Sequence, residues 1–245
     1  MQNKITQAVL LSAGLGTRLR PLTDTVPKVM VPLAGKPLLL HHMDQLKRFG
    51  VNEFFINLFY LPDVITSYFG DGSKFGFKVH YFLEKPEILG TAGGVKNFEE
   101  LLGDNFLVLY GDTFYEIDYG RLFEFYLSHP DAFGMGTARK TDHPWDSDLG
   151  VLGDDGKVLK FLIKPHKELP ENYWGMSAPY VFEKKVLEYV PAGAYYEIAH
   201  NLVPDLLARG YHYYAYTLRE GEFRKDIGTI ERYREVEEYL ERKRG

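Results

Sequence analysis

The chain has 245 residues, of which 45% are hydrophobic, and its formal net charge is -5 at pH 7. This composition supplies a full hydrophobic core and argues against a disordered chain, while the acidic balance argues against a general nucleic-acid surface. With no cysteine in the sequence, disulfides, thiolate metal sites and cysteine nucleophiles are excluded. We expect a cytoplasmic protein that binds no membrane, because no stretch approaches the roughly 20 apolar residues of a membrane span and the start lacks a secretion signal.

The first half of the chain alternates between strand-like and helix-like segments. The apolar run 5–11 ends in Ser-Ala-Gly, which is typical of a buried strand, and 37–49 repeats its apolar residues at helical spacing. The other expected strands are 54–59, 78–83, 106–110 and 133–137, and the other expected helices are 62–69, 92–102 and 118–128. The alternation predicts an α/β fold with a Rossmann-like, mostly parallel sheet flanked by helices.

The second half is less regular. Segments 149–152 and 158–163 flank Gly153-Asp154-Asp155-Gly156, which indicates a hairpin. The later elements expected are a strand at 173–182, a helix at 197–208, a strand at 211–218 and a charged helix at 229–242. Because no linker, low-complexity tract or internal repeat interrupts the chain, we expect a single domain over residues 1–245.

A glycine-containing loop follows the first predicted strand and is the most informative segment. In an open α/β sheet, ligands bind beyond the carboxyl ends of strands. Gly14 and Gly16 allow backbone N–H groups to approach an anion. Arg18 and Lys28 add positive charge suited to a triphosphate. Taken alone, the two glycines and Arg18 could equally form a tight turn with a solvated arginine.

Two other glycine loops do not fit this spacing. A dinucleotide fingerprint requires a small residue in place of Leu19 and a helix that opens at once, whereas Pro21 follows here. A Walker loop requires Gly-Lys-Ser/Thr after four residues, and that pattern is missing.

Polar and small residues also stand at the ends of later elements. Asp112 follows the strand 106–110, where a carboxylate could hold Mg²⁺ together with phosphate oxygens. Asp226 precedes the last helix, and a lone aspartate there is usually a turn or capping residue. The small residues from Leu89 to Gly94 could lie against a base or ribose, or could form a helix entry capped by Thr91.

The whole string from Gly14 to Lys28, followed by the later motifs in order, resembles the signature of the sugar-nucleotide pyrophosphorylases, a family of NDP-sugar nucleotidyltransferases. The resemblance implies a glycosyltransferase-A-like nucleotidyltransferase fold, with a nucleotide-binding half over about 1–140, a sugar-phosphate-binding half over about 141–245 and no C-terminal β-helix. It also implies an NTP and a sugar 1-phosphate as substrates, Mg²⁺ as cofactor, and a homo-oligomer as an allowed state. The pattern around Tyr60-Leu61-Pro62 looks most similar to mannose-1-phosphate guanylyltransferases, with uridylyltransferases for another hexose 1-phosphate as the alternative.

The resemblance assigns a role to each matching residue. Asp112 and Asp226 match the metal-binding pair, Lys164 matches the lysine that grips the phosphate of the sugar 1-phosphate, and Glu197 stands where an acidic residue lies near the sugar. The implied catalytic residues are Arg18, Lys28, Asp112 and Lys164. The implied nucleotide-binding residues are Ala13, Gly14, Gly16, Thr17, Arg18, Lys28, Glu84, Gly90 and Thr91.

Two departures from the family pattern fall on the sugar side. Ile163 stands where the family usually has glutamate, and Met176-Ser177-Ala178-Pro179-Tyr180 replaces a common Asn-Ala-Gly-Ile-Tyr. A non-catalytic nucleotide-sugar-sensing module is a rival class, but such a module would be expected to lose the metal carboxylates or Lys28 first. A glycosyltransferase would use Asp146-Ser147-Asp148 as its metal motif; we interpret that string as a polar loop, because no apolar strand precedes it.

Overall fold

The structure, a computed structural model, describes residues 4–243, so residues 1–3 and 244–245 of the predicted domain lie outside the described part. The chain folds into two compact units, each assembled from separate stretches. Of the described residues, unit 1 contains 4–5, 89–108 and 118–220, and unit 2 contains 6–88, 109–117 and 221–243. A single boundary near residue 140 therefore does not separate them. The assignment of a nucleotide half and a sugar half stays a prediction.

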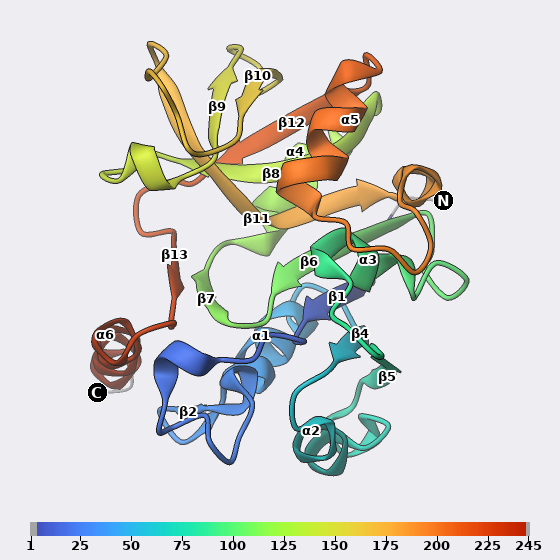
Figure 1. The fold of residues 1–245 in the computed structure, drawn as a ribbon, viewed down its shortest axis with the longest axis vertical. Helices are drawn as coiled ribbons and strands as arrows, with labels where there is room; N and C mark the ends of the chain where they lie inside the picture. The colour runs from blue at the N-terminus through green and yellow to red at the C-terminus, as the bar shows by residue number, and fades with distance from the viewer. Residues whose placement is uncertain (1–3, 244–245) are drawn as a thin grey trace. The chain divides into compact units, whose positions relative to one another are not determined.

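Unit 2 is built on a parallel sheet. Strand β4 (Glu53–Leu58) pairs in parallel with β1 (Gln7–Leu11) on one side and β5 (Lys78–Leu83) on the other (Figure 1). Helix α1 (Leu38–Lys47) precedes β4, and α2 (Pro62–Phe69) connects β4 to β5. These strands and helices confirm the elements predicted for this stretch, and the parallel pairing follows from the helical crossovers.

Two pairs of short strands complete unit 2. Strand β7 (Thr113–Glu116) pairs antiparallel with β13 (Phe223–Asp226), and β2 (Pro32–Leu33) pairs with β3 (Lys36–Pro37). None of these strands was predicted, because each is too short to show an alternating pattern. The β7–β13 pair matters for function, since it brings the segment after residue 221 beside the segment that follows Asp112.

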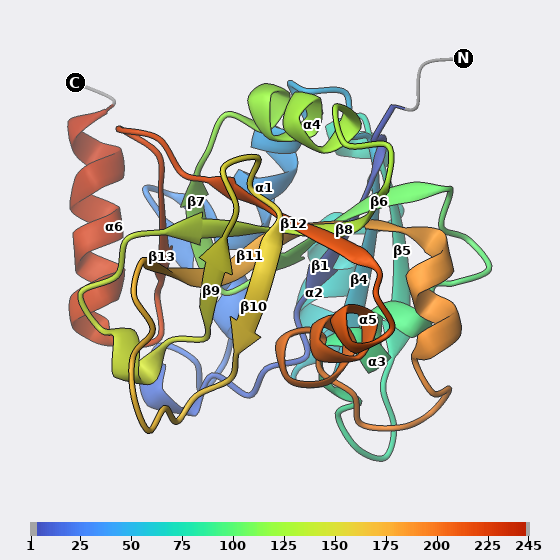
Figure 2. The same ribbon diagram turned by 90° about the horizontal axis from the view of Figure 1, so that it is seen from above.

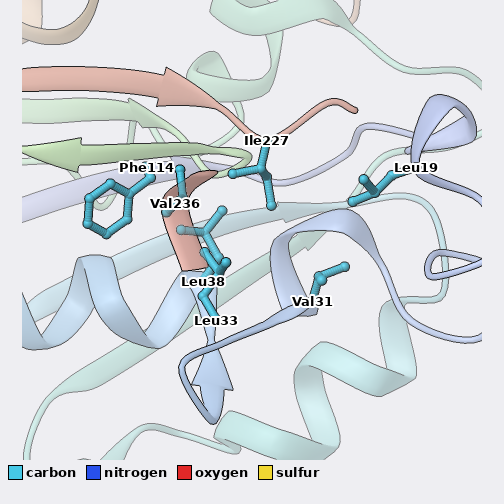
Figure 3. Close-up of a cluster of buried hydrophobic side chains, with 7 residues drawn as sticks. All are labelled: Leu19, Val31, Leu33, Leu38, Phe114, Ile227 and Val236. Atoms are coloured by element: carbon cyan, nitrogen blue, oxygen red, sulfur yellow. The ribbon is translucent and has the colours of Figure 1, made fainter. Parts of the chain in front are cut away.

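A buried apolar cluster holds the scattered segments of unit 2 together. Figure 3 shows its seven side chains: Leu19, Val31, Leu33, Leu38, Phe114, Ile227 and Val236. Val236 comes from the last helix, α6 (Ile230–Arg242), and Ile227 is fully buried directly after β13. Burial of one such side chain contributes about 1.5–3 kcal/mol. The cluster therefore fixes the backbone around Ile227, including the neighbouring Asp226.

Unit 1 contains a mixed sheet. Its long strand β11 (Tyr173–Glu183) pairs antiparallel with residues 105–108 of β6 (Asn105–Tyr110), with β8 (Ala132–Arg139) and with β9 (Leu149–Leu152) (Figure 2). Strand β12 (His212–Thr217) pairs in parallel with β8. The sheet is antiparallel along most of β11, unlike the parallel sheet of unit 2.

The hairpin and the helix predicted at 118–128 in unit 1 are confirmed. Strands β9 and β10 (Val158–Leu162) pair antiparallel, as predicted. Helix α4 (Tyr119–Leu127) begins after Asp118, whose side chain accepts a hydrogen bond from the backbone N–H of Arg121. Both α4 and α5 (Val203–Ala208) contact β12. No helix among residues 4–243 is both long enough and apolar enough to cross a membrane.

Two helix predictions in unit 1 were wrong in extent. The helix predicted at 92–102 is α3 (Gly90–Lys96). It is followed by turns over residues 97–101, in which the N–H of Phe98 bonds to the carbonyl of Val95, three residues before it. The helix predicted at 197–208 begins with a π-helical turn, Ile198–Leu202, in which the carbonyl of Glu197 accepts from two backbone N–H groups. In both segments the apolar spacing is helical, but the hydrogen bonding is not regularly α-helical.

Candidate active site

The loop after β1 has one glycine required by packing and one with open space beside it. Gly16 has φ +64°, and a Cβ there would lie 3.1 Å from Lys28 Cβ, so a side chain is excluded by conformation and by contact. The carbonyl of Gly16 also accepts a hydrogen bond from the Thr23 hydroxyl at 2.8 Å. A Cβ on Gly14, in contrast, would meet no atom within 4 Å. Space is therefore open beside the Gly14 backbone, and its role toward a nucleotide stays a prediction.

Lys28 connects the two aspartates that were predicted to bind metal. Its Nζ donates to Asp112 Oδ2 at 2.7 Å and to Asp226 Oδ1 at 3.1 Å. The lysine side chain is only 7% exposed, whereas the two carboxylates are 39% and 35% exposed. One ammonium thus offsets part of the charge of two carboxylates that face solvent. All three residues belong to unit 2, although 198 positions separate Lys28 from Asp226 in the sequence.

The side chains of Asp226 and Arg18 both lie beside Gly228. Its Oδ1 accepts from the backbone N–H of Gly228. A Cβ on Gly228 would lie 2.5 Å from Asp226 Oδ1 and 3.2 Å from Arg18 Nη2, so Gly228 leaves room for both side chains. The N-cap of α6 is Thr229, which accepts from the N–H of Arg232, so the capping alternative for Asp226 is wrong. The bond from the N–H of Gly228, two residues on, is an Asx turn, as the turn alternative expects. Arg18, Lys28, Asp112 and Asp226 therefore share one region of unit 2.

The chemistry of this region fits a divalent cation that arrives with a phosphorylated ligand. Carboxylate oxygens are the hard donors that Mg²⁺ prefers, and protein Mg²⁺ sites commonly use one or two carboxylates plus substrate phosphates. Asp112 and Asp226 already converge on one cationic atom, Lys28 Nζ. Among the described residues, no group of three or more His, Cys, Asp or Glu side chains could hold a metal. A metal held by Asp112 and Asp226 would therefore take its remaining ligands from outside the protein, such as the phosphate oxygens of a substrate.

Two residues that the sequence analysis missed support the backbone beside Asp112. A Cβ on Gly111 would lie 2.8 Å from the carbonyl oxygen of Leu11 and 2.9 Å from Ser12 Oγ, so only glycine permits this close approach to the end of β1. His42 Nε2 lies 3.3 Å from the carbonyl oxygen of Gly111 and donates to it, since a carbonyl can only accept. Burial lowers the pKa of His42 from 6.5 to about 3, so the imidazole stays neutral.

Glu84, predicted to hold the base, is fully buried. Its Oε1 accepts from Asn57 Nδ2 at 2.8 Å, and Asn57 Oδ1 accepts from the backbone N–H of Ser12 at 2.6 Å. These bonds connect the ends of β5 and β4 to the end of β1, and the loop that carries Gly14 and Arg18 starts at the end of β1. Direct contact between Glu84 and a base would require movement of the residues that cover it, and this role stays a prediction.

The predicted site residues Ala13 and Thr17 lie in unit 2, in the loop after β1, whereas four others belong to unit 1: Gly90, Thr91, Lys164 and Glu197. A Cβ on Gly90 would lie 2.7 Å from the carbonyl oxygen of Tyr196, and Thr91 Oγ1 accepts from the N–H of Ile198 at 2.8 Å. Thr91 is not a helix cap, because α3 begins at Gly90. The glycine segment is therefore packed closely on the segment around Glu197, and its role toward a base stays a prediction.

Comparisons with known proteins show a family and relatives to which the chain is similar. The family model described as nucleotidyl transferase matches residues 7–243. The chain is 32% identical over 242 residues to a UTP–glucose-1-phosphate uridylyltransferase of Synechocystis, covering 93% of this chain and 61% of that protein. It is 33% identical over 226 residues to a mannose-1-phosphate guanylyltransferase of Mycobacterium tuberculosis, covering 91% and 61%. The chain thus spans about three fifths of the length of these relatives.

A solved structure shows the same fold. The crystal structure of an apo UDP-glucose pyrophosphorylase superposes with a TM-score of 0.83 over 98% of this chain and 100% of that chain, at 18% identity. The predicted fold class, a mixed sheet flanked by helices, is confirmed by this likeness.

The buried His42 predicts a pH dependence of stability. Between about pH 3 and 6.5 the unfolded chain binds a proton at His42 that the folded chain does not bind. Its contribution is therefore fully present above pH 6.5 and is lost as the pH falls toward 3, with a slope of up to about 1.4 kcal/mol per pH unit. In urea unfolding, the free energy of unfolding should fall less between about pH 6.5 and pH 4.5 for His42→Gln than for the wild type.

The control for this prediction is His143→Gln, which removes an exposed imidazole of unit 1 and should preserve the wild-type pH dependence. Equal slopes in His42→Gln and the wild type would contradict the account.

Proposed function

The chain belongs to the nucleotidyl transferase family, and we propose that it transfers a nucleotidyl group from an NTP to a sugar 1-phosphate and releases pyrophosphate. The observation that carries the proposal is the convergence of Lys28 on Asp112 and Asp226 inside one unit. A cation and two solvent-facing carboxylates at the end of β6 form the kind of site at which a metal-bound triphosphate binds. The two relatives described above are named for this reaction type.

Asp112 and Asp226 would hold Mg²⁺. When bound, the ion would offset negative charge on the α-phosphate and on the acceptor phosphate. The two carboxylates suit this role, because each contacts Lys28 through one oxygen and both are exposed by more than a third. Gly228 and Ile227 would keep Asp226 in place, the first by its backbone N–H and the second by its burial.

Lys28 and Arg18 would act on the triphosphate. A lysine ammonium is a point charge on a flexible stem, so Lys28 can turn from the carboxylates toward phosphate oxygens when a nucleotide enters. Arg18 would present a planar guanidinium to the same group. The open face of Gly14 would let backbone N–H groups approach the phosphates. These contacts would stabilise the charge that develops on the departing pyrophosphate.

The reaction would be a direct displacement. A phosphate oxygen of the acceptor attacks the α-phosphorus, the bond to the bridging oxygen breaks, and pyrophosphate leaves with the electron pair. No protein nucleophile is required, because the acceptor is already an anion, so catalysis rests on positioning and charge stabilisation. Lys164 would bind the acceptor phosphate, and Glu197 would lie near its sugar.

The substrates we propose first are GTP and mannose 1-phosphate, on the pattern around Tyr60-Leu61-Pro62. The alternative is a uridylyltransferase for another hexose 1-phosphate. One relative is named for each of these two activities, and the two relatives have similar sequence identity to this chain.

The experiment that tests the function is a pyrophosphate-release screen of four NTPs against a panel of sugar 1-phosphates in the presence of Mg²⁺. We expect release only when an NTP and a sugar 1-phosphate are both present, and fastest with GTP and mannose 1-phosphate. Tight nucleotide binding without turnover across the whole panel would contradict the proposal and favour a nucleotide-sugar-sensing module.

A second prediction follows from the proposed role of Asp112 and Asp226 as metal ligands. Asp112→Asn and Asp226→Asn should each reduce turnover by roughly 10²-fold or more, the scale of losing a principal electrostatic group. The double variant should be much less than additive, because both residues would serve one ion. Folding should be little affected, since Lys28 keeps one carboxylate partner in either single variant.

Turnover at saturating Mg²⁺ and thermal melting should be measured together for these variants. The matched control is Asp24→Asn, at an exposed aspartate paired with Arg20 in the same loop region, which should leave turnover unchanged. Near-normal turnover in Asp226→Asn would contradict the assignment of Asp226 as a metal ligand.

A further inference from the structure

The loop from Gly14 to Lys28 carries Arg18 on a stretch of chain that is largely exposed. Within this loop, Leu19 and Thr23 are buried, with exposed fractions of 0% and 1%. A loop that a ligand must order on binding lowers the affinity for that ligand, because conformational freedom is lost. The contacts of the buried residues therefore decide how far the loop is arranged before a nucleotide enters.

Thr23 closes the part of the loop that contains Arg18. Its hydroxyl donates to the carbonyl oxygen of Gly16 at 2.8 Å. A Cβ on Gly16 would lie 3.2 Å from Thr23 Cγ2, so the backbone at Gly16 lies close against the Thr23 side chain. Between these two residues, Leu19 packs in the apolar cluster of unit 2. Residues 16–23 therefore form one closed segment, which we call the arginine turn.

Tyr60 joins the arginine turn to the parallel sheet. It stands two residues after the end of β4, and its hydroxyl donates to the carbonyl oxygen of Thr23 at 3.0 Å. The next residue, Leu61, has φ +46° and ψ +54°, a left-handed conformation. That conformation is unfavourable for a residue with a Cβ and persists where the surrounding structure determines the backbone. The turn that follows β4 is therefore closely determined beside Tyr60.

The parallel sheet does not depend on the Tyr60 hydroxyl. Strands β1, β4 and β5 are joined by backbone pairing, and Glu84, Asn57 and Ser12 link their ends by buried hydrogen bonds. The Tyr60 hydroxyl, in contrast, contacts the backbone of a loop residue 37 positions away. Loss of that hydroxyl should therefore release the arginine turn and leave the sheet in place.

We propose that Tyr60 is a positioning residue for the nucleotide, whose hydroxyl holds the arginine turn where Arg18 and the Gly14 backbone would meet the triphosphate. The proposal rests on the proposed function and adds a residue that acts through the loop. The fraction of molecules with a correctly placed loop sets the apparent affinity for the nucleotide. The acceptor phosphate is assigned to Lys164 in another segment, so the effect of Tyr60 falls on the NTP.

The first test removes one hydroxyl. Tyr60→Phe should raise the KM for the NTP about 3- to 10-fold, the scale of one neutral hydrogen bond. The KM for the sugar 1-phosphate, kcat at saturating NTP and the melting temperature should change little, because neither the acceptor side nor the sheet uses this bond. Steady-state kinetics with each substrate varied in turn, together with thermal melting, measures these quantities.

The matched control is Tyr81→Phe. The Tyr81 hydroxyl also donates to a backbone carbonyl in unit 2, that of Gly70 at 2.7 Å, but it does not contact the loop. This variant should keep the wild-type KM for the NTP. An equal rise of both KM values in Tyr60→Phe, or a lower melting temperature with unchanged KM values, would overturn the positioning role.

The second test changes the other side of the contact. Thr23→Val removes the hydroxyl that closes the arginine turn and should also raise the KM for the NTP, whereas Thr23→Ser keeps a hydroxyl and should restore most of the affinity. The double variant Tyr60→Phe/Thr23→Val should lose less than the sum of the two single effects, because both residues hold one segment. Additive effects, or no rescue by Thr23→Ser, would contradict a shared role.

The third test is hydrogen exchange, which does not depend on turnover. The backbone N–H of Leu22 bonds to the carbonyl of Leu19 at 3.1 Å inside the arginine turn, and that of Gly111 bonds to Leu11 at 2.9 Å outside it. Exchange at Leu22 should be about 3- to 10-fold faster in Tyr60→Phe than in the wild type, with exchange at Gly111 unchanged. Equal exchange at Leu22 in the two proteins would overturn the proposal.

Calorimetry with a non-hydrolysable NTP analogue separates the positioning role from the proposed reaction. Weaker binding of the analogue by Tyr60→Phe, in a protein whose wild type releases no pyrophosphate, would uphold the positioning role and refute the reaction. Pyrophosphate release by the wild type, with the same affinity for the analogue in Tyr60→Phe, would do the reverse.

Discussion

One ammonium between two carboxylates is the interaction on which the rest of the site depends. Asp112 and Asp226 would repel each other if no cation lay between them, and Lys28 Nζ contacts both, at 2.7 and 3.1 Å. The arrangement leaves both carboxylates partly exposed while the lysine stem is buried. We therefore propose that a metal ion could replace the Lys28 ammonium between the two carboxylates, and that Lys28 could then bind an anionic ligand, without unfolding of the segments that carry these residues.

The fold holds these three residues by two different means. Apolar burial fixes the segment around Asp226, because Ile227 packs in the cluster that α6 completes (Figure 3). Buried polar contacts fix the end of the parallel sheet, where Glu84, Asn57 and Ser12 are joined by hydrogen bonds and His42 contacts the carbonyl of Gly111. A buried polar group that keeps its partners rigidifies its surroundings, and one left without them is costly. The loop carrying Gly14 and Arg18 thus starts from a firmly held strand end.

Much of this could be predicted from the sequence, for identifiable reasons. The parallel sheet of unit 2 follows from long segments with clear periodicity, and Lys28, Asp112 and Asp226 follow from a motif in which residue types and order are specific. Asn57 and His42 were missed because each stands within an apolar element, where a polar residue has no pattern of its own. Strands β7 and β13 were missed because their pairing depends on contacts between segments about 110 residues apart. The string Asp146-Ser147-Asp148 was interpreted as a polar loop because no apolar strand precedes it, and it lies in a 3-10 turn and the loop before β9.

The most direct test of the central claim is a crystal structure with Mn²⁺ in place of Mg²⁺ and a non-hydrolysable NTP analogue. The account predicts an anomalous peak coordinated by Asp112, Asp226 and phosphate oxygens, with Lys28 Nζ moved onto the triphosphate. A bound nucleotide whose metal lies away from these carboxylates, with Lys28 still between Asp112 and Asp226, would contradict it.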